Sequence, residues 1–153
     1  MTEAMAPAAT PAAPSTSVDR GVAARWTPKL GVKFCAVSSF FLANYHRLHE
    51  GHEPKPLYPT EVLVIIHLID HKWDARAPFP TVGLLAKRMS LSERAVRDAT
   101  RSLEQRGLLR RESAVYSGPN RYHLEPLFER LEAMMEADAP TAVVAPPSVE
   151  AAA

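Results

Sequence analysis

The sequence predicts a mainly α-helical domain that carries one small β-hairpin. Three observations support this prediction. Apolar residues recur at helical spacing in several segments between residues 39 and 136. The most regular of these segments begins at a serine, Ser92, and is followed by a glycine, Gly107. Two short alternating segments then flank the turn-forming residues 116–120.

The two ends of the chain are predicted to be disordered tails, at residues 1–24 and 138–153. Both are rich in alanine and proline and contain few bulky apolar side chains. Such segments cannot bury enough apolar surface to offset the entropy lost on ordering. The chain of 153 residues is therefore expected to hold one domain, at residues 25–137.

Bulk composition favours a cytoplasmic protein with one core. The apolar fraction of 46% is ordinary for a globular protein. The single cysteine, Cys35, excludes a disulfide within the chain and is expected to be a small buried apolar group. No apolar run approaches the roughly 18 residues that a membrane-spanning helix requires.

Three elements outside the central motif are expected. After a short extended segment at residues 32–37, a helix should run from Ser38 or Ser39 to about Glu50. A second helix should begin at Pro59, whose fixed φ suits a first helical position, and run to Trp73. It is apolar nearly all round, as is typical of a helix at the centre of a small core. The last helix should span residues 125–136.

Residues 81–107 predict two helices joined by a tight turn. Ser92 is a good N-cap for the second helix, because its hydroxyl can accept from free backbone N–H groups. Gly107 can adopt the left-handed conformation that ends it. Leu91, in the turn, is expected to be an apolar plug between the helices. The first helix has its own apolar set, namely Val82, Leu84, Leu85 and Met89.

The second helix is predicted to bury one face and expose the other. Ala95, Val96, Ala99 and Leu103 share one face at spacings of three and four. The hairpin that follows, at residues 108–124, would form a wing beside this helix. The predicted fold is therefore a winged helix-turn-helix, mainly α with a small β-hairpin.

Positive charge is concentrated in this motif. Residues 81–121 contain nine lysines and arginines and four acids, a local charge of +5, whereas the whole chain carries only +1. Such a local excess is the electrostatic footprint of a nucleic-acid partner.

The exposed face of the second helix supplies the candidate base contacts. The major groove admits a helix, and the planar fork of arginine can donate twice to guanine. Arg94 and Arg97 are predicted base readers, with Arg101 nearer the DNA backbone and Asp98 orienting Arg94 or Arg101. Further candidates in the first turn are Ser92 and Glu93.

Candidate backbone contacts lie on either side of this helix. Thr81, at the start of the first helix, is placed to donate to a phosphate. On the hairpin, Arg110, Arg111, Asn120 and Arg121 could reach phosphates or the neighbouring minor groove. Such contacts position a protein without reading sequence.

No catalytic residue, cofactor or metal ligand is predicted. His67 and His71 have a spacing that could hold a metal, but no glutamate stands beside His67 as the metalloprotease pattern requires. The sequence contains no glycine-rich phosphate loop and no serine elbow. We therefore expect a protein that acts without catalysis.

Residues 79–109, FPTVGLLAKRMSLSERAVRDATRSLEQRGLL, resemble the bacterial winged-helix family found in plasmid and phage replication initiators and in small helix-turn-helix regulators. The resemblance extends upstream to residues 58–71, YPTEVLVIIHLIDH, and covers the chain from about Val32 to Leu131. Tyr58 departs from it, because relatives often place a serine or aspartate cap there. The lack of a second domain argues against full initiator activity.

The resemblance and the residues together imply a sequence-specific protein that binds double-stranded DNA, acts as a transcriptional regulator and is associated with the nucleoid in the cytoplasm. Dimerisation is expected, because one short helix rarely supplies enough contacts. The helices at residues 39–50 and 125–136 are candidate dimer surfaces, although either could simply close the monomer core. Two alternatives are a plasmid or phage replication-initiation protein and a winged helix that binds protein.

Overall fold

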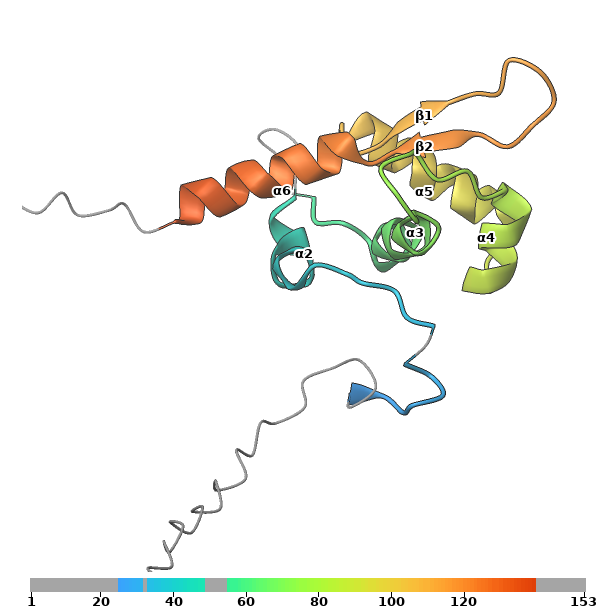
Figure 1. Cartoon of the computed structure of the whole chain (residues 1–153). Helices are drawn as coiled ribbons and strands as arrows, with labels where there is room; N and C mark the ends of the chain where they lie inside the picture. The colour runs from blue at the N-terminus through green and yellow to red at the C-terminus, as the bar shows by residue number, and fades with distance from the viewer. Residues whose placement is uncertain (1–24, 32, 49–54, 140–153) are drawn as a thin grey trace, which may run out of the picture. The chain divides into compact units, whose positions relative to one another are not determined.

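The computed structural model describes residues 25–31, 33–48 and 55–139 (Figure 1). The chain divides into two compact units, residues 1–34 and 35–153, and each is described by itself. In the first unit, the backbone N–H of Gly31 donates to the Thr27 carbonyl at 2.8 Å and closes a turn. The predicted tails at residues 1–24 and 138–153 lie outside the described residues, apart from Asp138 and Ala139, and so does Val32. Asp138 is instead the final residue of the last helix.

The second unit is mainly helical, and a two-stranded antiparallel sheet follows its helix-turn-helix (Figure 1). This arrangement confirms the predicted winged helix-turn-helix. Helix α3 packs against α4 and α5, and α2 packs against α6. The elements in order are α2 (Ser39–Asn44), the 3-10 turn η1 (Tyr45–Arg47), α3 (Pro59–Asp70), α4 (Val82–Met89), α5 (Glu93–Gln105), β1 (Arg110–Glu112), β2 (Arg121–His123) and α6 (Glu125–Asp138).

Helix α3 lies at the centre of the core, as its sequence predicts. Val64, Ile65 and Leu68 are almost completely buried, and Pro59 occupies the first helical position. The helix is shorter than expected, because it ends at Asp70. Trp73 lies beyond this end and is 90% exposed. No helix in the described part of the chain is long and apolar enough to cross a membrane.

Helix α2 is also shorter than the expected segment to Glu50. It ends at Asn44, whose side-chain amide donates to the Phe40 carbonyl at 3.0 Å. Such a bond competes with the backbone for a helical acceptor. The chain then tightens into η1, which ends at Arg47, and residues 49–54 lie outside the described part.

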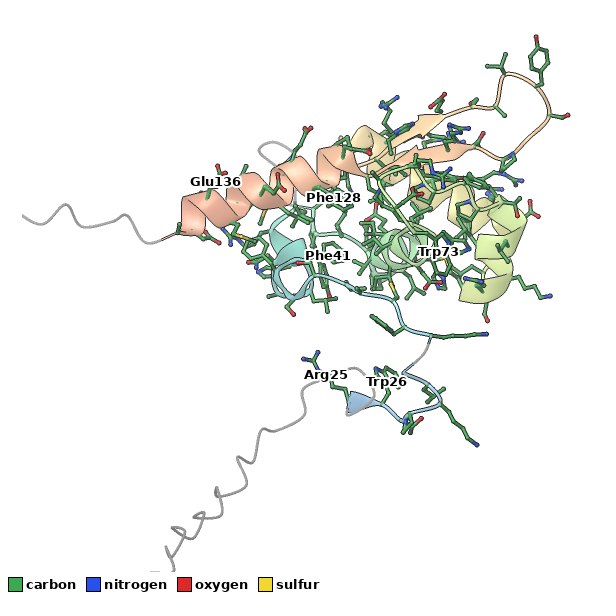
Figure 2. The ribbon with its side chains drawn as sticks, in the orientation of Figure 1. Arg25, Trp26, Phe41, Trp73, Phe128 and Glu136 are labelled. Atoms are coloured by element: carbon green, nitrogen blue, oxygen red, sulfur yellow. The ribbon has the colours of Figure 1, made fainter. Side chains whose placement is uncertain are left out.

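Helices α2 and α6 close the monomer core from one side. Phe41 of α2 and Leu127 and Leu131 of α6 are buried, and Phe128 packs against the same core (Figure 2). At the far end of α6, Arg47 Nη2 donates to Asp138 Oδ1 at 2.9 Å. This hydrogen bond lowers the pKa of Asp138. Much of the apolar surface considered for dimerisation is therefore used within one chain.

The turn between α4 and α5 differs from the prediction in one respect. Ser90 adopts the left-handed conformation, with φ of 55°, and the Leu91 N–H donates to the Ala86 carbonyl at 3.0 Å. Leu91 itself is exposed, so its prediction as an apolar plug is wrong. The backbone turns back on α4 and leaves the Leu91 side chain outside, while Met89 and Val96 are buried on the two helices.

A buried ion pair joins the start of α3 to the end of α5. Arg106 Nε donates to Glu61 Oε1 at 3.2 Å, and the two side chains are 10% and 2% exposed. Glu61 Oε2 also accepts from the Tyr58 N–H at 2.7 Å, so this helix start is capped despite Tyr58. The guanidinium donates further to the Lys55 and Pro56 carbonyls. The Glu61 carboxylate is therefore buried with partners for both of its oxygens, while the outer nitrogens of the guanidinium bond to carbonyls nearer the surface.

We expect Arg106→Ala to lower the free energy of unfolding by about 3–5 kcal/mol, because it leaves the Glu61 carboxylate buried without its cation. Urea unfolding followed by circular dichroism measures this loss. The exposed Arg101→Ala is the matched control and should change stability by less than about 0.5 kcal/mol.

The double variant Glu61→Gln with Arg106→Met should recover most of that stability, because it removes both charges and keeps an acceptor for the Tyr58 N–H. If Arg106→Ala and the Arg101→Ala control had the same urea midpoint of unfolding, the Glu61–Arg106 pair would not stabilise the domain.

Candidate nucleic-acid interface

Helix α5 presents the candidate base contacts because its two faces differ sharply. The Ser92 hydroxyl accepts from the Ala95 N–H at 3.1 Å and caps the helix as predicted. Val96, Ala99 and Leu103 are buried on one face. Gly107 has φ of 70° and follows the C-cap residue, so the predicted stop is also confirmed. The buried face fixes the rotation of the helix about its axis.

The opposite face of α5 carries three exposed arginines. The side chains of Arg94, Arg97 and Arg101 are 89%, 52% and 64% exposed. Arg97 Nη2 lies 2.6 Å from Glu93 Oε2, one helical turn away. Asp98 lies between the other two arginines, at 3.4 Å from Arg101 Nη1 and 3.8 Å from Arg94 Nε.

These ion pairs orient the arginines without fixing them. Exposed pairs of this kind contribute only about 0.2–1 kcal/mol, because water and salt screen them. A phosphate or a guanine edge can therefore replace the carboxylate at small cost. Arg94 is the most exposed of the three and has the longest of these contacts, so it is the least constrained.

The hairpin forms the predicted wing, defined here as residues 110–123. Arg110 pairs with His123, Arg111 with Tyr122 and Glu112 with Arg121 in antiparallel register. Arg111 Nη2 also lies 3.3 Å from Glu104 Oε2 of α5, so this arginine ties the wing to that helix. Among the described residues, no ion pair is formed by Arg110 or Arg121, and both residues are exposed.

The base of the wing is held by a histidine between two carboxylates. His123 Nε2 lies 2.9 Å from Glu112 Oε2, and its Nδ1 lies 3.7 Å from Glu125 Oε2 of α6. The bond to His123 lowers the pKa of Glu112, with smaller contributions from the charges of Arg121 and Arg110. Strand β1 is therefore tied to the start of α6 through one side chain.

Folding brings together two predicted phosphate contacts that are far apart in sequence. Thr81 and Asn120 line one open cavity of about 400 Å³, between the start of α4 and the wing. The Tyr122 N–H donates to the Pro78 carbonyl at 2.9 Å and joins β2 to the segment before α4. Tyr122 is buried, and this burial raises the pKa of its phenol. The Thr81 hydroxyl also accepts from the Leu84 N–H at 3.1 Å as the α4 cap.

The helical histidines have a structural explanation. His71 Nδ1 lies 2.8 Å from the His67 carbonyl, which also accepts from the His71 backbone N–H at 3.3 Å, so the ring adds a second hydrogen bond at the end of α3. Burial lowers the pKa of His67, and the charge of Arg88 lowers it further. In the part of the chain that the structure describes, no group of three or more His, Cys, Asp or Glu side chains is placed to hold a metal ion.

Sequence reasoning missed two features that surround the candidate interface. One is the Glu61–Arg106 pair, whose members are 45 residues apart. The other is the exposure of Phe79 and Tyr116 beside the wing. The only sequence signal for the second feature was the position of these aromatic residues next to prolines and turn formers, where a core side chain is not expected.

Comparison with known proteins agrees with this geometry. No curated protein matches the chain. Residues 56–109 match a family model described as a helix-turn-helix domain, and this segment runs from just before α3 to just before β1. A domain of this kind typically binds DNA. Residues 56–109 of this chain are therefore similar to that helix-turn-helix family.

Proposed function

We propose that this protein binds double-stranded DNA in a sequence-specific manner and regulates transcription by occupying its site, without catalysis. One observation carries the proposal. Three arginines face outward from a helix whose other face packs on the core through Val96, Ala99 and Leu103, and a basic hairpin lies next to that helix. Such a surface suits the major groove, which is wide enough to admit a helix.

In this proposal, Arg94 and Arg97 read base edges from the first two turns of α5. Each bidentate contact with guanine would contribute about 1–3 kcal/mol of discrimination against a wrong base. Asp98 is a positioning residue for Arg94 and Arg101, because its carboxylate lies between them. Glu93 does the same for Arg97 and can itself accept from the exocyclic amine of cytosine. The Ser92 hydroxyl oxygen is used to cap α5. Its proton remains free to donate to DNA.

The remaining candidates position the protein on the phosphates. Arg101, Arg110 and Arg121 supply charge on either side of the base contacts, and Thr81 and Asn120 supply polar groups from one shared cavity. Arg111 contributes less directly, because it is paired with Glu104. Contacts of this kind fix the register on the duplex without reading its sequence.

Homodimer formation is part of the proposal, acting on two half-sites. The large apolar side chains that α2 and α6 leave exposed are Leu42 and Met135, while Phe41 and Leu131 are buried within the chain. The dimer surface would therefore be small in each protomer. Binding to DNA would then help to hold two copies together, because both occupy neighbouring half-sites.

Affinity for duplex DNA should fall steeply with salt. Three phosphate contacts by Arg101, Arg110 and Arg121 give a slope of about −2.7, so affinity should drop roughly 40-fold per protomer between about 50 and 200 mM salt. Fluorescence anisotropy with a labelled duplex measures the slope. A salt-independent affinity would contradict a DNA interface built from these residues.

Two alanine variants should separate base reading from phosphate contact. Arg97→Ala should weaken binding to a selected site by about 1–3 kcal/mol and change binding to random duplex much less. Arg110→Ala should weaken both about equally and reduce the salt slope by about 0.9. Equal binding by the parent and both variants would show that the assigned residues do not contact DNA.

Selection of bound fragments from genomic DNA tests the regulatory role and supplies the site for these measurements. Fragments next to promoters are expected. Fragments confined to an origin of replication would show instead that the protein acts in replication initiation.

A further inference from the structure

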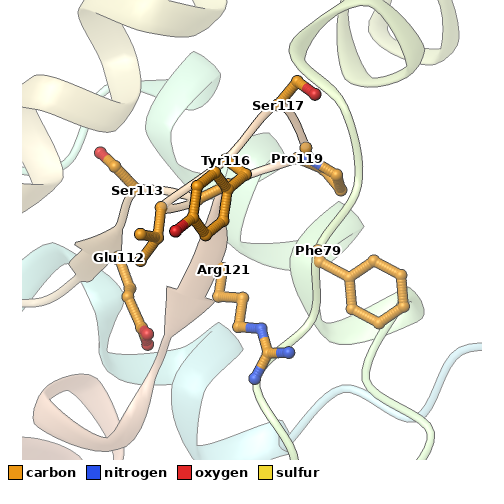
Figure 3. Close-up of a pocket in the computed structure, with 10 residues that line it drawn as sticks. Phe79, Glu112, Ser113, Tyr116, Ser117, Pro119 and Arg121 are labelled. Atoms are coloured by element: carbon orange, nitrogen blue, oxygen red, sulfur yellow. The ribbon is translucent and has the colours of Figure 1, made fainter.

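An open cavity of about 520 Å³ runs along one side of the wing (Figure 3). Its wall consists of hairpin residues 112–119, with Arg121 from β2 and Phe79 from the loop before α4. The Tyr122 N–H donates to the Pro78 carbonyl, so the backbone next to Phe79 is fixed against β2. The cavity is therefore formed by two segments that the fold holds together.

Large aromatic side chains are exposed in this cavity. Phe79 is 62% exposed and Tyr116 is 87% exposed. Tyr122 of the same hairpin is buried in the core, so these two aromatic side chains are left outside it. Exposed apolar groups gathered around one opening are typical of a binding site. Val115, which precedes Tyr116, is also exposed and extends the same surface.

A cation accompanies these aromatic groups. Arg121 lines the cavity and, among the described residues, makes no ion pair. Its cross-strand neighbour Glu112 is bonded to His123 at 2.9 Å. The guanidinium is therefore available to an anion.

Aromatic faces beside an arginine suit nucleotides that are not paired. Stacking on aromatic side chains needs an open base face, and a cation beside it can bind the phosphate. Bases within a duplex offer no such face. The adjoining cavity shares Gly118 and Pro119 with this one and contains Thr81 and Asn120, two proposed phosphate contacts. The wing cavity is thus continuous with the proposed duplex interface.

We propose that the wing cavity binds unpaired nucleotides of a DNA strand that leaves the duplex next to α5. Phe79 and Tyr116 stack on the bases, and Arg121, which is also one of the proposed duplex contacts, contacts the phosphate at the point where the strand leaves the duplex. The protein would then prefer a junction between duplex and single strand over a blunt duplex. This inference rests on the proposed function, because α5 and the first cavity hold the duplex part.

Fluorescence anisotropy at one salt concentration tests this preference, with the full chain and two probes. One probe is a blunt mixed-sequence duplex, and the other is the same duplex with a short single-stranded thymidine extension. The extension should raise affinity by roughly fivefold or more. Phe79→Ala and Tyr116→Ala should each remove most of that gain and leave binding to the blunt duplex within about twofold.

Trp73→Ala is the matched control, because Trp73 is an exposed aromatic residue that does not line the cavity. It should keep the full preference for the extended probe. Thermal unfolding should be the same for all three variants, since each removes an exposed side chain.

Equal affinity for both probes would overturn this inference and leave the proposed function intact, as long as the blunt duplex is bound. Failure to bind either probe would overturn both. If Tyr116→Ala weakened the two probes equally, the wing loop would be a contact with the duplex itself, and the cavity would not be a site for unpaired nucleotides.

Discussion

The position of the candidate interface depends on one buried ion pair. Glu61 lies in the first turn of α3, and Arg106 lies just after the last turn of α5. Their contact fixes the end of α5 against the central helix of the core, while the Lys55 and Pro56 carbonyls occupy the rest of the guanidinium. Buried charges are tolerated only when paired in this way. This contact at the end of α5 acts together with the buried face of the helix to oppose sliding and rotation on α3, so the arginines keep one direction.

The interface itself follows a different principle. Its cations are exposed and their ion pairs are weak, so they can exchange a carboxylate for a ligand at little cost. The buried and the exposed pairs thus have separate roles in one helix. Arg106 fixes the helix, whereas Arg94, Arg97 and Arg101 remain adjustable at its surface. A fixed helix that carries weakly paired arginines suits the proposed contact with base edges.

The wing is connected to this scaffold at three points. Arg111 reaches Glu104 of α5, His123 lies between Glu112 and Glu125, and the Tyr122 N–H bonds to Pro78. These contacts hold the base of the hairpin and leave its loop, with Tyr116, free of the core. The wing loop is therefore placed to contact a ligand beyond the reach of the helices.

The helices of the motif could be predicted from the amino-acid sequence, because the signals that define them are local. Ser92 and Gly107 mark the ends of α5 through backbone hydrogen bonding and φ, and the spacing from Val96 to Leu103 assigns its buried face. The arginine face then follows by exclusion. These features need only the geometry of a single helix, so periodicity was sufficient to predict them.

Which residues from distant segments come into contact depends on the packing of whole helices and strands. Nothing local distinguishes Arg106 from the other arginines of this segment, yet it is buried beside Glu61 while they remain exposed. Likewise, the left-handed conformation of Ser90 places the Leu91 side chain on the outside of the turn. Phe79 lies beside the wing because the Tyr122 N–H donates to the carbonyl of the neighbouring Pro78. Contacts between distant segments depend on how whole elements pack, and hydrophobic spacing carries no information about that.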